Sequence, residues 1–250
     1  MNEIQSVDIR GVKIHNITLR EAADAASDMI RTDAFHAVYT PNAEIVQLCI
    51  EQPQIRDLIN RAELVLPDGA GVILAAKILG TPLKAKVAGI EFGEEMIRRS
   101  GKEQFGIFLL GGKPGIAETA KEKMLEKYPD ANFVGTHDGY FQKDGAENDA
   151  VIEEINASGA KVLFVCLGVP VQEKWIDANR DRLPGVRLAM GLGGSLDGYA
   201  GAVKRAPKIF VRLNLEWFYR LCKEPRRIGR MMKLPKFVFG TLFHKLFHRK

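Results

Sequence analysis

The side chains best suited to chemistry in this chain follow short apolar segments and precede amphipathic ones. Asp68 stands in LVLPDGAGV, where a carboxylate at the tip of a strand could act as a general base and take a proton from an attacking hydroxyl. An equally ordinary interpretation is that Asp68 caps the following helix. Thr40 and Asn42 in TPN present the same pair of alternatives, since asparagine is also a common helix cap.

Three further segments offer hydrogen-bonding groups to a ligand. Gln172 in GVPVQEKW can donate and accept at once, which suits a sugar hydroxyl or a phosphate, or it can lie on a solvated first helical turn. Asp197 in GLGGSLDGYAG could accept a hydrogen bond from ribose or uracil, or it could cap a helix. Gly111 and Gly112 in LLGGKPG would let backbone amides approach a phosphate, although a tight strand–helix turn explains them equally well.

Several kinds of site are not expected. LLGGKPG fits neither the P-loop nor the GxGxxG pattern. The sequence has no Ser-His-Asp or Cys-His arrangement with supporting context, and it has no Asp-x-Asp pair. Many nucleotide-sugar transferases use such a pair to hold a metal on the diphosphate, so we expect no metal site and no cofactor. The histidines do not cluster as metal ligands; they are His15, His36, His137, His244 and His248.

The elements that must position these residues alternate along the chain. VDIRGVKIHNIT predicts a small hairpin with Arg10-Gly11 at its turn. Strands are predicted at 37–40, 64–66, 105–110, 133–136, 162–167 and 186–190. Helices are predicted at 19–31, 43–49, 55–61, 71–79, 91–99, 116–127, 146–157, 173–180 and 209–222. Several strands are apolar on both faces, which is typical of a parallel sheet covered by helices.

The order of strands and helices predicts a doubly wound, mainly parallel α/β domain. In such sheets ligands bind beyond the carboxyl ends of the strands. We therefore expect the segments that follow the strands, including GYF with Tyr140, to converge on one crevice. Their glycines, amides and carboxylates suit a sugar or a nucleotide.

The C-terminal segment differs from the rest. Residues 204–250 hold 14 Lys and Arg against two Glu, so they carry +12, whereas residues 1–203 carry −7. LEWFYRLCKEPRRIGR places a block of arginines beside Trp217 and Tyr219. Behind it, an apolar stripe opposes a basic face on a predicted helix, which is typical of a helix lying in a membrane interface. The stripe consists of Phe239, Leu242, Phe243, Leu246 and Phe247; the basic face holds His244, Lys245, Arg249 and Lys250.

Composition limits the remaining possibilities. The protein has 250 residues, of which 46% are hydrophobic, so one large α/β domain with an appendage can bury a core. The three cysteines are odd in number and far apart, which favours a reducing compartment over a disulfide framework. We expect neither a signal peptide at the N-terminus nor a membrane-spanning segment.

Seven motifs, in this order, are similar to those of the WecG/TagA/CpsF glycosyltransferases. They are TPNAEIV, LPDGAGV, VAGIEFGEEM, LLGGKPG, GVPVQEKW, GLGGSLDGYAGAVKRAP and EWFYRL…EPRRIGR. The resemblance runs from the hairpin to about Arg230. It implies an inverting, metal-independent transfer from a UDP-sugar, typically UDP-N-acetylmannosamine, to a sugar on undecaprenyl diphosphate. It also implies the cytoplasmic face of the bacterial membrane, in synthesis of teichoic acid linkage units or other surface polysaccharides.

The resemblance implies a role for each matching position. Asp68 resembles the family's catalytic base. The donor sugar is expected at Thr40, Asn42 and Gln172, and the uridine at Tyr140 and Asp197. The arginines that complete the active site are expected to be Arg220, Arg227 and Arg230. Lys86 replaces an arginine that often precedes the family's V[TA]G segment, so the charge remains but the bidentate fork is lost.

We therefore expect a glycosyltransferase core at residues 1–203 and a membrane-associating appendage at 204–250. In this hypothesis the arginine block closes over the diphosphate, and the tail holds that block at the membrane. A homo-oligomer is compatible with the sequence. UDP-glucose or UDP-uronic acid donors occur among relatives and stay open. A nucleic-acid-binding module would explain the basic tail, but a continuous apolar stripe and the lack of a recognisable binding motif oppose it.

Overall fold

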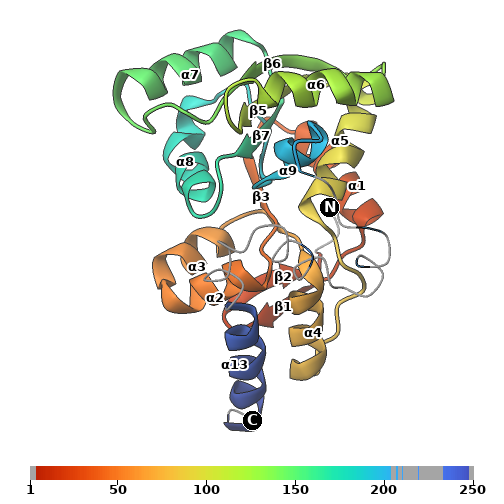
Figure 1. The fold of residues 1–250 in the computed structure, drawn as a ribbon, viewed down its shortest axis with the longest axis vertical. Coiled ribbons are helices and arrows are strands. Elements are labelled where there is room, and N and C mark those ends of the chain that lie inside the picture. Colours follow the sequence, from red (N-terminus) through yellow and green to blue (C-terminus); the bar gives the residue numbers. More distant parts are fainter. Residues whose placement is uncertain (1–3, 204–206, 208–209, 211–218, 220–232, 248–250) are drawn as a thin grey trace.

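The computed structural model describes residues 4–203, 207, 210, 219 and 233–247. Its centre is a six-stranded sheet in which all neighbouring strands are parallel (Figure 1). The strands in spatial order are β4 (Leu64–Val65), β3 (His36–Tyr39), β8 (Leu188–Gly191), β7 (Val162–Cys166), β5 (Ile107–Gly111) and β6 (Phe133–His137). The predicted parallel α/β sheet is confirmed, because an apolar segment predicted each of these strands.

Two strands begin later than their apolar segments suggest. The backbone N–H of Phe105 donates to Ser100 O, which extends the end of the preceding helix and delays β5 to Ile107. The backbone N–H of Val186 donates to Leu183 O, so Val186 belongs to a turn and β8 starts at Leu188. Both residues are buried although neither is in a strand, which is why hydrophobicity alone misplaced the boundary.

Helices pack on both faces of the sheet, as expected for a doubly wound domain. Successive residues of β7 contribute to different cores, with Leu163 and Val165 in one and Val162 and Phe164 in the other. The first core is covered by α2 (Ala43–Glu51), α3 (Pro53–Asn60), α4 (Gly69–Leu79), α7 (Gly145–Ala157) and α8 (Val171–Asn179). The second is covered by α1 (Leu19–Ile30), α5 (Gly89–Glu103), α6 (Ile116–Lys127) and α9 (Ser195–Tyr199).

The predicted N-terminal hairpin is confirmed as β1 (Ser6–Ile9) and β2 (Val12–His15), which pair antiparallel. Arg10 and Gly11 form its two-residue turn, with φ of 57° and 87°. Positive φ at both central positions matches the right-handed twist of paired strands. The hairpin is attached to the sheet, since the backbone N–H of Val65 donates to His15 Nδ1 over 2.9 Å.

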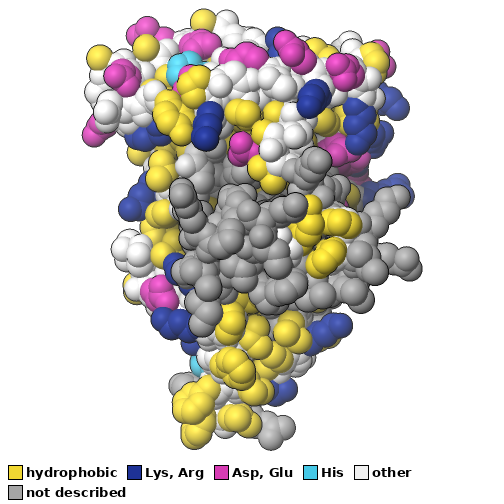
Figure 2. All heavy atoms as spheres, in the orientation of Figure 1, with side chains coloured by type: hydrophobic (Ala, Val, Ile, Leu, Met, Phe, Trp, Pro, Cys, Tyr) yellow, Lys and Arg dark blue, Asp and Glu magenta, His cyan; other side chains and the backbone are white. Residues whose placement is uncertain are grey.

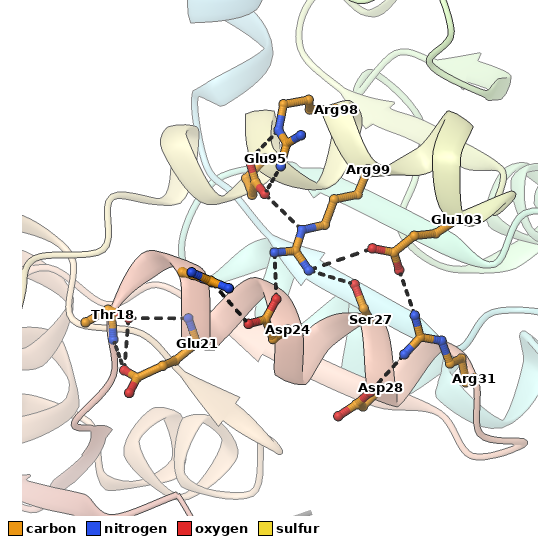
Figure 3. Close-up of polar contacts among 11 residues, drawn as sticks. Thr18, Glu21, Asp24, Ser27, Asp28, Arg31, Glu95, Arg98, Arg99 and Glu103 are labelled. Atoms are coloured by element: carbon orange, nitrogen blue, oxygen red, sulfur yellow. Dashed lines mark hydrogen bonds and ion pairs between the residues drawn. The ribbon is translucent and has the colours of Figure 1, made fainter.

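A network of charged side chains joins α1 to α5 (Figure 3). Arg99 lies at its centre, with Nη2 2.7 Å from Asp24 Oδ1 and Nε 2.9 Å from Glu95 Oε1. Its Nη1 donates to Ser27 Oγ over 3.2 Å. The Arg99 side chain is only 14% exposed, so the network is screened less than single surface pairs are. It holds in place the helix whose first residue, Gly89, lies at the candidate site.

The C-terminal helix α13 (Lys233–Phe247) packs across α2 and α4 at one end of the molecule (Figure 1). Phe237 and Thr241 are fully buried in this contact. Lys236 Nζ adds an ion pair of 2.7 Å with Glu51 Oε1, at the end of α2. No helix in the described part of the chain is long and apolar enough to cross a membrane.

The helix predicted at 209–222 falls almost wholly outside the described residues, so it stays a prediction. The same holds for the division into units at 1–203 and 204–250. The C-terminal helix behind them is confirmed, and it contacts the α/β core directly.

Candidate active site

Most of the predicted site residues that the structure describes lie at the edge of the sheet where the parallel strands end. From β7 the chain crosses to β8, and from β5 it crosses to β6 on the other side. These opposite crossovers put a topological switch point between β7 and β5, where open α/β sheets bind ligands. Gly111 ends β5 and Gly112 follows it at this point, and Gln172 is the second residue of the helix that follows β7.

Asp68 occupies the N-cap position of α4, but its side chain makes no capping hydrogen bond to that helix. Instead, its Oδ2 accepts a hydrogen bond of 3.2 Å from the backbone N–H of Gly89, the first residue of α5. The capping interpretation is therefore wrong for α4. The carboxylate lies at the N-terminus of a neighbouring 15-residue helix, where the positive end of the helix dipole favours negative charge.

Thr40 lies against the same glycine. A Cβ atom placed on Gly89 would lie 2.8 Å from Thr40 Oγ1, so the hydroxyl contacts the first turn of α5. That hydroxyl is 3.4 Å from the carbonyl oxygen of Gly191, to which it donates. Gly89 therefore brings Asp68 and Thr40 together, although 27 residues separate them in the chain.

Asn42 is the N-cap of α2, and its Oδ1 accepts from the backbone N–H of Ile45 over 3.1 Å. Its capping role is confirmed; a role in ligand binding stays a prediction. A Cβ atom placed on Gly69 would lie 3.6 Å from Asn42 Cβ, so this side chain is next to the Asp68 loop.

Gln172 is buried, with 2% of its surface exposed, so the solvated-turn interpretation is wrong. Its Oε1 accepts a hydrogen bond of 2.9 Å from the backbone N–H of Gly193. Its Nε2 lies 2.9 Å from where a Cβ atom of Gly191 would be. Because Thr40 bonds to the carbonyl of the same Gly191, Thr40 and Gln172 both lie against one residue of β8.

Glu173 was not identified from the sequence. It follows Gln172 directly and is only 1% exposed. Burial raises the pKa of its carboxyl to about 7, and the hydrogen bond from Gln172 only partly opposes this. A glutamate in VQEKW looks like an ordinary solvated residue of a first helical turn, so sequence reasoning had no signal for its burial.

The glycine-rich turn after β5 packs tightly on β7. Gly111 has φ of 131°, and a Cβ atom there would lie 2.4 Å from the carbonyl oxygen of Cys166. The backbone N–H of Gly139 donates to Gly112 O over 2.8 Å, which places the GYF loop beside this turn. Tight-turn geometry is therefore present, and phosphate contact by the same glycines stays a prediction.

Tyr140 lies in the loop after β6, and Asp197 lies in the helix that follows β8. Tyr140 follows Gly139 and is 70% exposed. Asp197 lies in the first turn of α9, whose N-cap is Gly194, so it is not the cap. The charge of Asp197 contributes to the raised pKa of the Cys166 thiol, which comes mainly from burial, so Asp197 lies near the end of β7.

Lys86 is half-buried in the segment between α4 and α5. The next residue, Val87, donates its backbone N–H to Pro67 O over 2.8 Å, which holds this segment against the Asp68 loop. Arg220, Arg227 and Arg230 lie outside the described residues. Within the described residues, no group of three or more His, Cys, Asp or Glu could hold a metal ion.

A doubly wound α/β domain with a carboxylate, a hydroxyl and an amide gathered beyond its strand ends has the architecture in which ligands bind at such an edge. The profile of the glycosyl transferase WecG/TagA/CpsF family matches residues 7–250. The chain belongs to this family and is a glycosyltransferase.

Curated relatives cover most of the chain. A protein of Bacillus spizizenii strain W23 is 37% identical over 209 residues, which are 83% of this chain and 79% of the relative. A protein of Staphylococcus aureus strain MRSA252 is 33% identical over 235 residues, which are 93% of this chain and 91% of the relative. Both relatives are named N-acetylglucosaminyldiphosphoundecaprenol N-acetyl-beta-D-mannosaminyltransferase.

Proposed function

We propose that this glycosyltransferase moves N-acetylmannosamine from a UDP-sugar to N-acetylglucosamine carried on undecaprenyl diphosphate. The observation that carries the proposal is the convergence of Asp68, Thr40 and Gln172 around Gly89 and Gly191 at the carboxyl edge of the sheet. The names of two relatives that cover most of the chain support this donor sugar and this acceptor.

Asp68 is the proposed general base. The acceptor hydroxyl attacks the anomeric carbon from the face opposite the diphosphate and inverts that carbon. A new carbon–oxygen bond forms to the acceptor, the bond to the β-phosphate oxygen breaks, and the hydroxyl proton passes to Asp68. The Gly89 N–H holds one carboxylate oxygen, which orients the other for the incoming hydroxyl.

The donor is proposed to lie along the same edge. The uridine lies near Tyr140 and Asp197, the diphosphate at Gly111 and Gly112, and the sugar against Thr40, Asn42 and Gln172. The backbone arrangement supports this order, because Gly139 bonds to Gly112 on one side and Gln172 bonds to Gly193 on the other.

Departing UDP gains negative charge on its β-phosphate, which fixed positive groups must stabilise. Arg220, Arg227 and Arg230 are the proposed source, with Lys86 near the Asp68 loop as a further cation. Metal independence is part of the proposal. It is supported by the lack of an Asp-x-Asp pair in the sequence.

We also propose that α13 holds the enzyme at the cytoplasmic face of the membrane as a peripheral protein. The five stripe residues Phe239, Leu242, Phe243, Leu246 and Phe247 are 45–71% exposed. Figure 2 displays hydrophobic side chains gathered at the α13 end of the molecule. An exposed apolar stripe on a helix in a chain of net charge +5 suits an anionic lipid surface, which is also where the lipid-linked acceptor would lie.

A screen of UDP-sugars with a short-chain analogue of undecaprenyl-diphosphate-N-acetylglucosamine tests the proposal. We expect UDP release with UDP-N-acetylmannosamine, unchanged by EDTA, and a disaccharide product of β configuration if the donor is an α-linked sugar. Preference for UDP-glucose or a UDP-uronic acid would replace the sugar and keep the mechanism. UDP release that EDTA abolishes would overturn metal independence.

A further inference from the structure

Glu173 is the most deeply buried carboxylate near the candidate site, and the mechanism above gives it no role. Its side chain is 1% exposed. Its Oε2 atom has no hydrogen-bond partner among the described residues. A buried carboxylate oxygen without a partner costs stability, so a residue of this type at this position calls for an explanation.

Among the described residues, Gln172 is the only side chain that donates a hydrogen bond to the Glu173 carboxylate, which connects Glu173 to the candidate site. Its Oε1 accepts from Gln172 Nε2 over 2.9 Å. The other end of the Gln172 carboxamide is fixed independently, because Gly193 N–H can only donate and therefore faces Oε1. The two bonds together allow one orientation of the carboxamide and direct the remaining Nε2 hydrogen away from Glu173.

We propose that Glu173 is a positioning residue for sugar transfer: it fixes the carboxamide of Gln172 so that one Nε2 hydrogen is presented to the donor. This inference rests on the proposed function, since it takes Gln172 as a contact of the donor. It adds a residue that touches no substrate but acts through one that does.

A structural alternative is that Glu173 only stabilises the start of α8. It is the third residue of that helix, where a carboxylate interacts well with the helix dipole. Glutamates in that role are normally solvated, however, whereas this one lies against β3 and α2. The Tyr39 hydroxyl of β3 is 3.5 Å from the Glu173 backbone carbonyl, to which it donates.

Two titratable groups that face Glu173, the Tyr39 hydroxyl and the Cys49 thiol, stay neutral near pH 7. Burial, followed by the Glu173 charge, raises the pKa of Tyr39 in β3 above its usual range. The same causes raise the pKa of the Cys49 thiol in α2 to about 12. On α8 itself, Asp177 is paired with Arg61 over 2.9 Å. A change of charge near pH 7 at this position therefore belongs to Glu173.

A double-mutant cycle on the transfer reaction tests the proposal. Glu173→Leu removes the acceptor oxygen, and we expect kcat/KM for the donor to fall about 100-fold, since loss of precise positioning costs rates of that order. In a Gln172→Ala background the same substitution should change kcat/KM less than about twofold, because residues that act as a unit are not additive. A full loss in both backgrounds would assign Glu173 to folding alone and overturn the proposal.

Two further variants complete the design. Glu173→Gln keeps an acceptor oxygen for Gln172 Nε2 and should retain most activity, whereas Glu173→Leu should not. Ile176→Ala, which truncates a 1% exposed side chain one turn along α8, should lower stability and leave kcat/KM of the folded protein unchanged. Equal losses in Ile176→Ala and Glu173→Leu would contradict a positioning role.

A measurement without substrate separates this inference from the proposed function. The side-chain amide nitrogen of Gln172, assigned by its loss in Gln172→Ala, should shift with a midpoint near pH 7 in the unsubstituted protein and not in Glu173→Gln. No transfer with any donor, together with this titration, would overturn the proposed function only. If the Gln172 signal shows the same pH dependence in the unsubstituted protein and in Glu173→Gln, the inference would be overturned even in an active enzyme.

Discussion

At the scale of single residues, Asp68 shows how one position can satisfy a local pattern and serve another part of the fold. Its backbone begins α4, as a cap would, while its side chain bonds to the first N–H of α5. Both interpretations of the sequence concern the same residue, but only the direction of its side chain distinguishes them.

Replacing Asp68 tests the proposed base. Asp68→Asn keeps the shape and the acceptor for Gly89 N–H, and it removes the base. We expect kcat to fall about 100- to 10,000-fold, the usual contribution of general acid–base catalysis, with little change in UDP affinity. Steady-state kinetics and calorimetric titration with UDP measure the two quantities. Asp57→Asn, an exposed aspartate on α3, is the control, and near-normal turnover of Asp68→Asn would remove Asp68 as the base.

Glu173 makes stability depend on pH. The pKa of Glu173 is raised from 4.5 to about 7 in the folded protein, so the folded state binds more protons than the unfolded state between these values. The free energy of unfolding contributed by Glu173 is therefore full below about pH 4.5 and is lost as pH rises through 7. One pKa unit corresponds to about 1.4 kcal/mol, so the loss reaches about 3 kcal/mol.

Glu173→Gln removes this titration. The free energy of unfolding of Glu173→Gln, minus that of the unsubstituted protein, should be about 2.5 kcal/mol larger at pH 8 than at pH 5. The value is below the full loss because part of that loss has already occurred at pH 5. Urea unfolding at the two pH values measures the difference. A difference that is equal at both would mean that Glu173 is not titrating in this range.

At the scale of elements, α13 contacts the two helices that begin at candidate site residues. A Cβ atom on Gly71, in the first turn of α4, would lie 2.7 Å from Ala43 Cβ and 2.8 Å from Leu234 Cδ1. Ala43 is the first residue of α2, directly after Asn42. The contact of Leu234 in α13 with Gly71 and Ala43 therefore helps to set the distance between the loops that carry Asn42 and Asp68.

Gly71→Ala should overfill this three-helix contact. Overpacking of this kind typically costs about 1–3 kcal/mol, and we expect the separation of α2 from α4 to lower kcat as well. Adding Leu234→Ala should recover part of both losses, since it removes one of the two clashing atoms. Leu74→Ala, at a 45% exposed position on α4, is the control. Full stability and activity of Gly71→Ala would mean that the spacing is not critical.

At the scale of the whole molecule, one end presents an apolar helix face that no described residue covers. Phe239, Phe243 and Phe247 are 61–71% exposed, so replacing them leaves the buried side of α13, with Phe237 and Thr241, intact. Substituting these three residues therefore tests the proposed membrane contact without disturbing the packing of α13. Deleting residues 234–250 would remove both at once.

The triple substitution of Phe239, Phe243 and Phe247 by Ser should greatly reduce binding to anionic vesicles. Each buried Phe contributes about 1.5–3 kcal/mol of transfer free energy, so the loss should exceed 100-fold in partitioning even if each residue inserts only in part. Sedimentation with vesicles of phosphatidylglycerol measures it, with the melting temperature as the check on folding. Unchanged sedimentation would place the membrane contact elsewhere.

The sequence by itself determined the local elements and the residues at their ends. Short apolar segments alternating with amphipathic ones predicted the six parallel strands. They also predicted every α-helix between residues 19 and 180, with boundaries correct to within a few residues. The same reading placed Asp68, Thr40 and Gln172 directly after strands. Periodicity and turn chemistry are local properties, so they can be read without knowing the partners of each element.

Only the tertiary structure decided which of these ends meet. The strand order β4-β3-β8-β7-β5-β6 brings residues 40, 68 and 191 together, and it depends on the long-range packing of two cores. Packing also buries Glu173, turns Asp68 toward α5 and docks α13 on α2 and α4. A side chain's burial and partners are set by elements distant in the chain, because hydrophobic contacts are not directional and many arrangements share one local pattern.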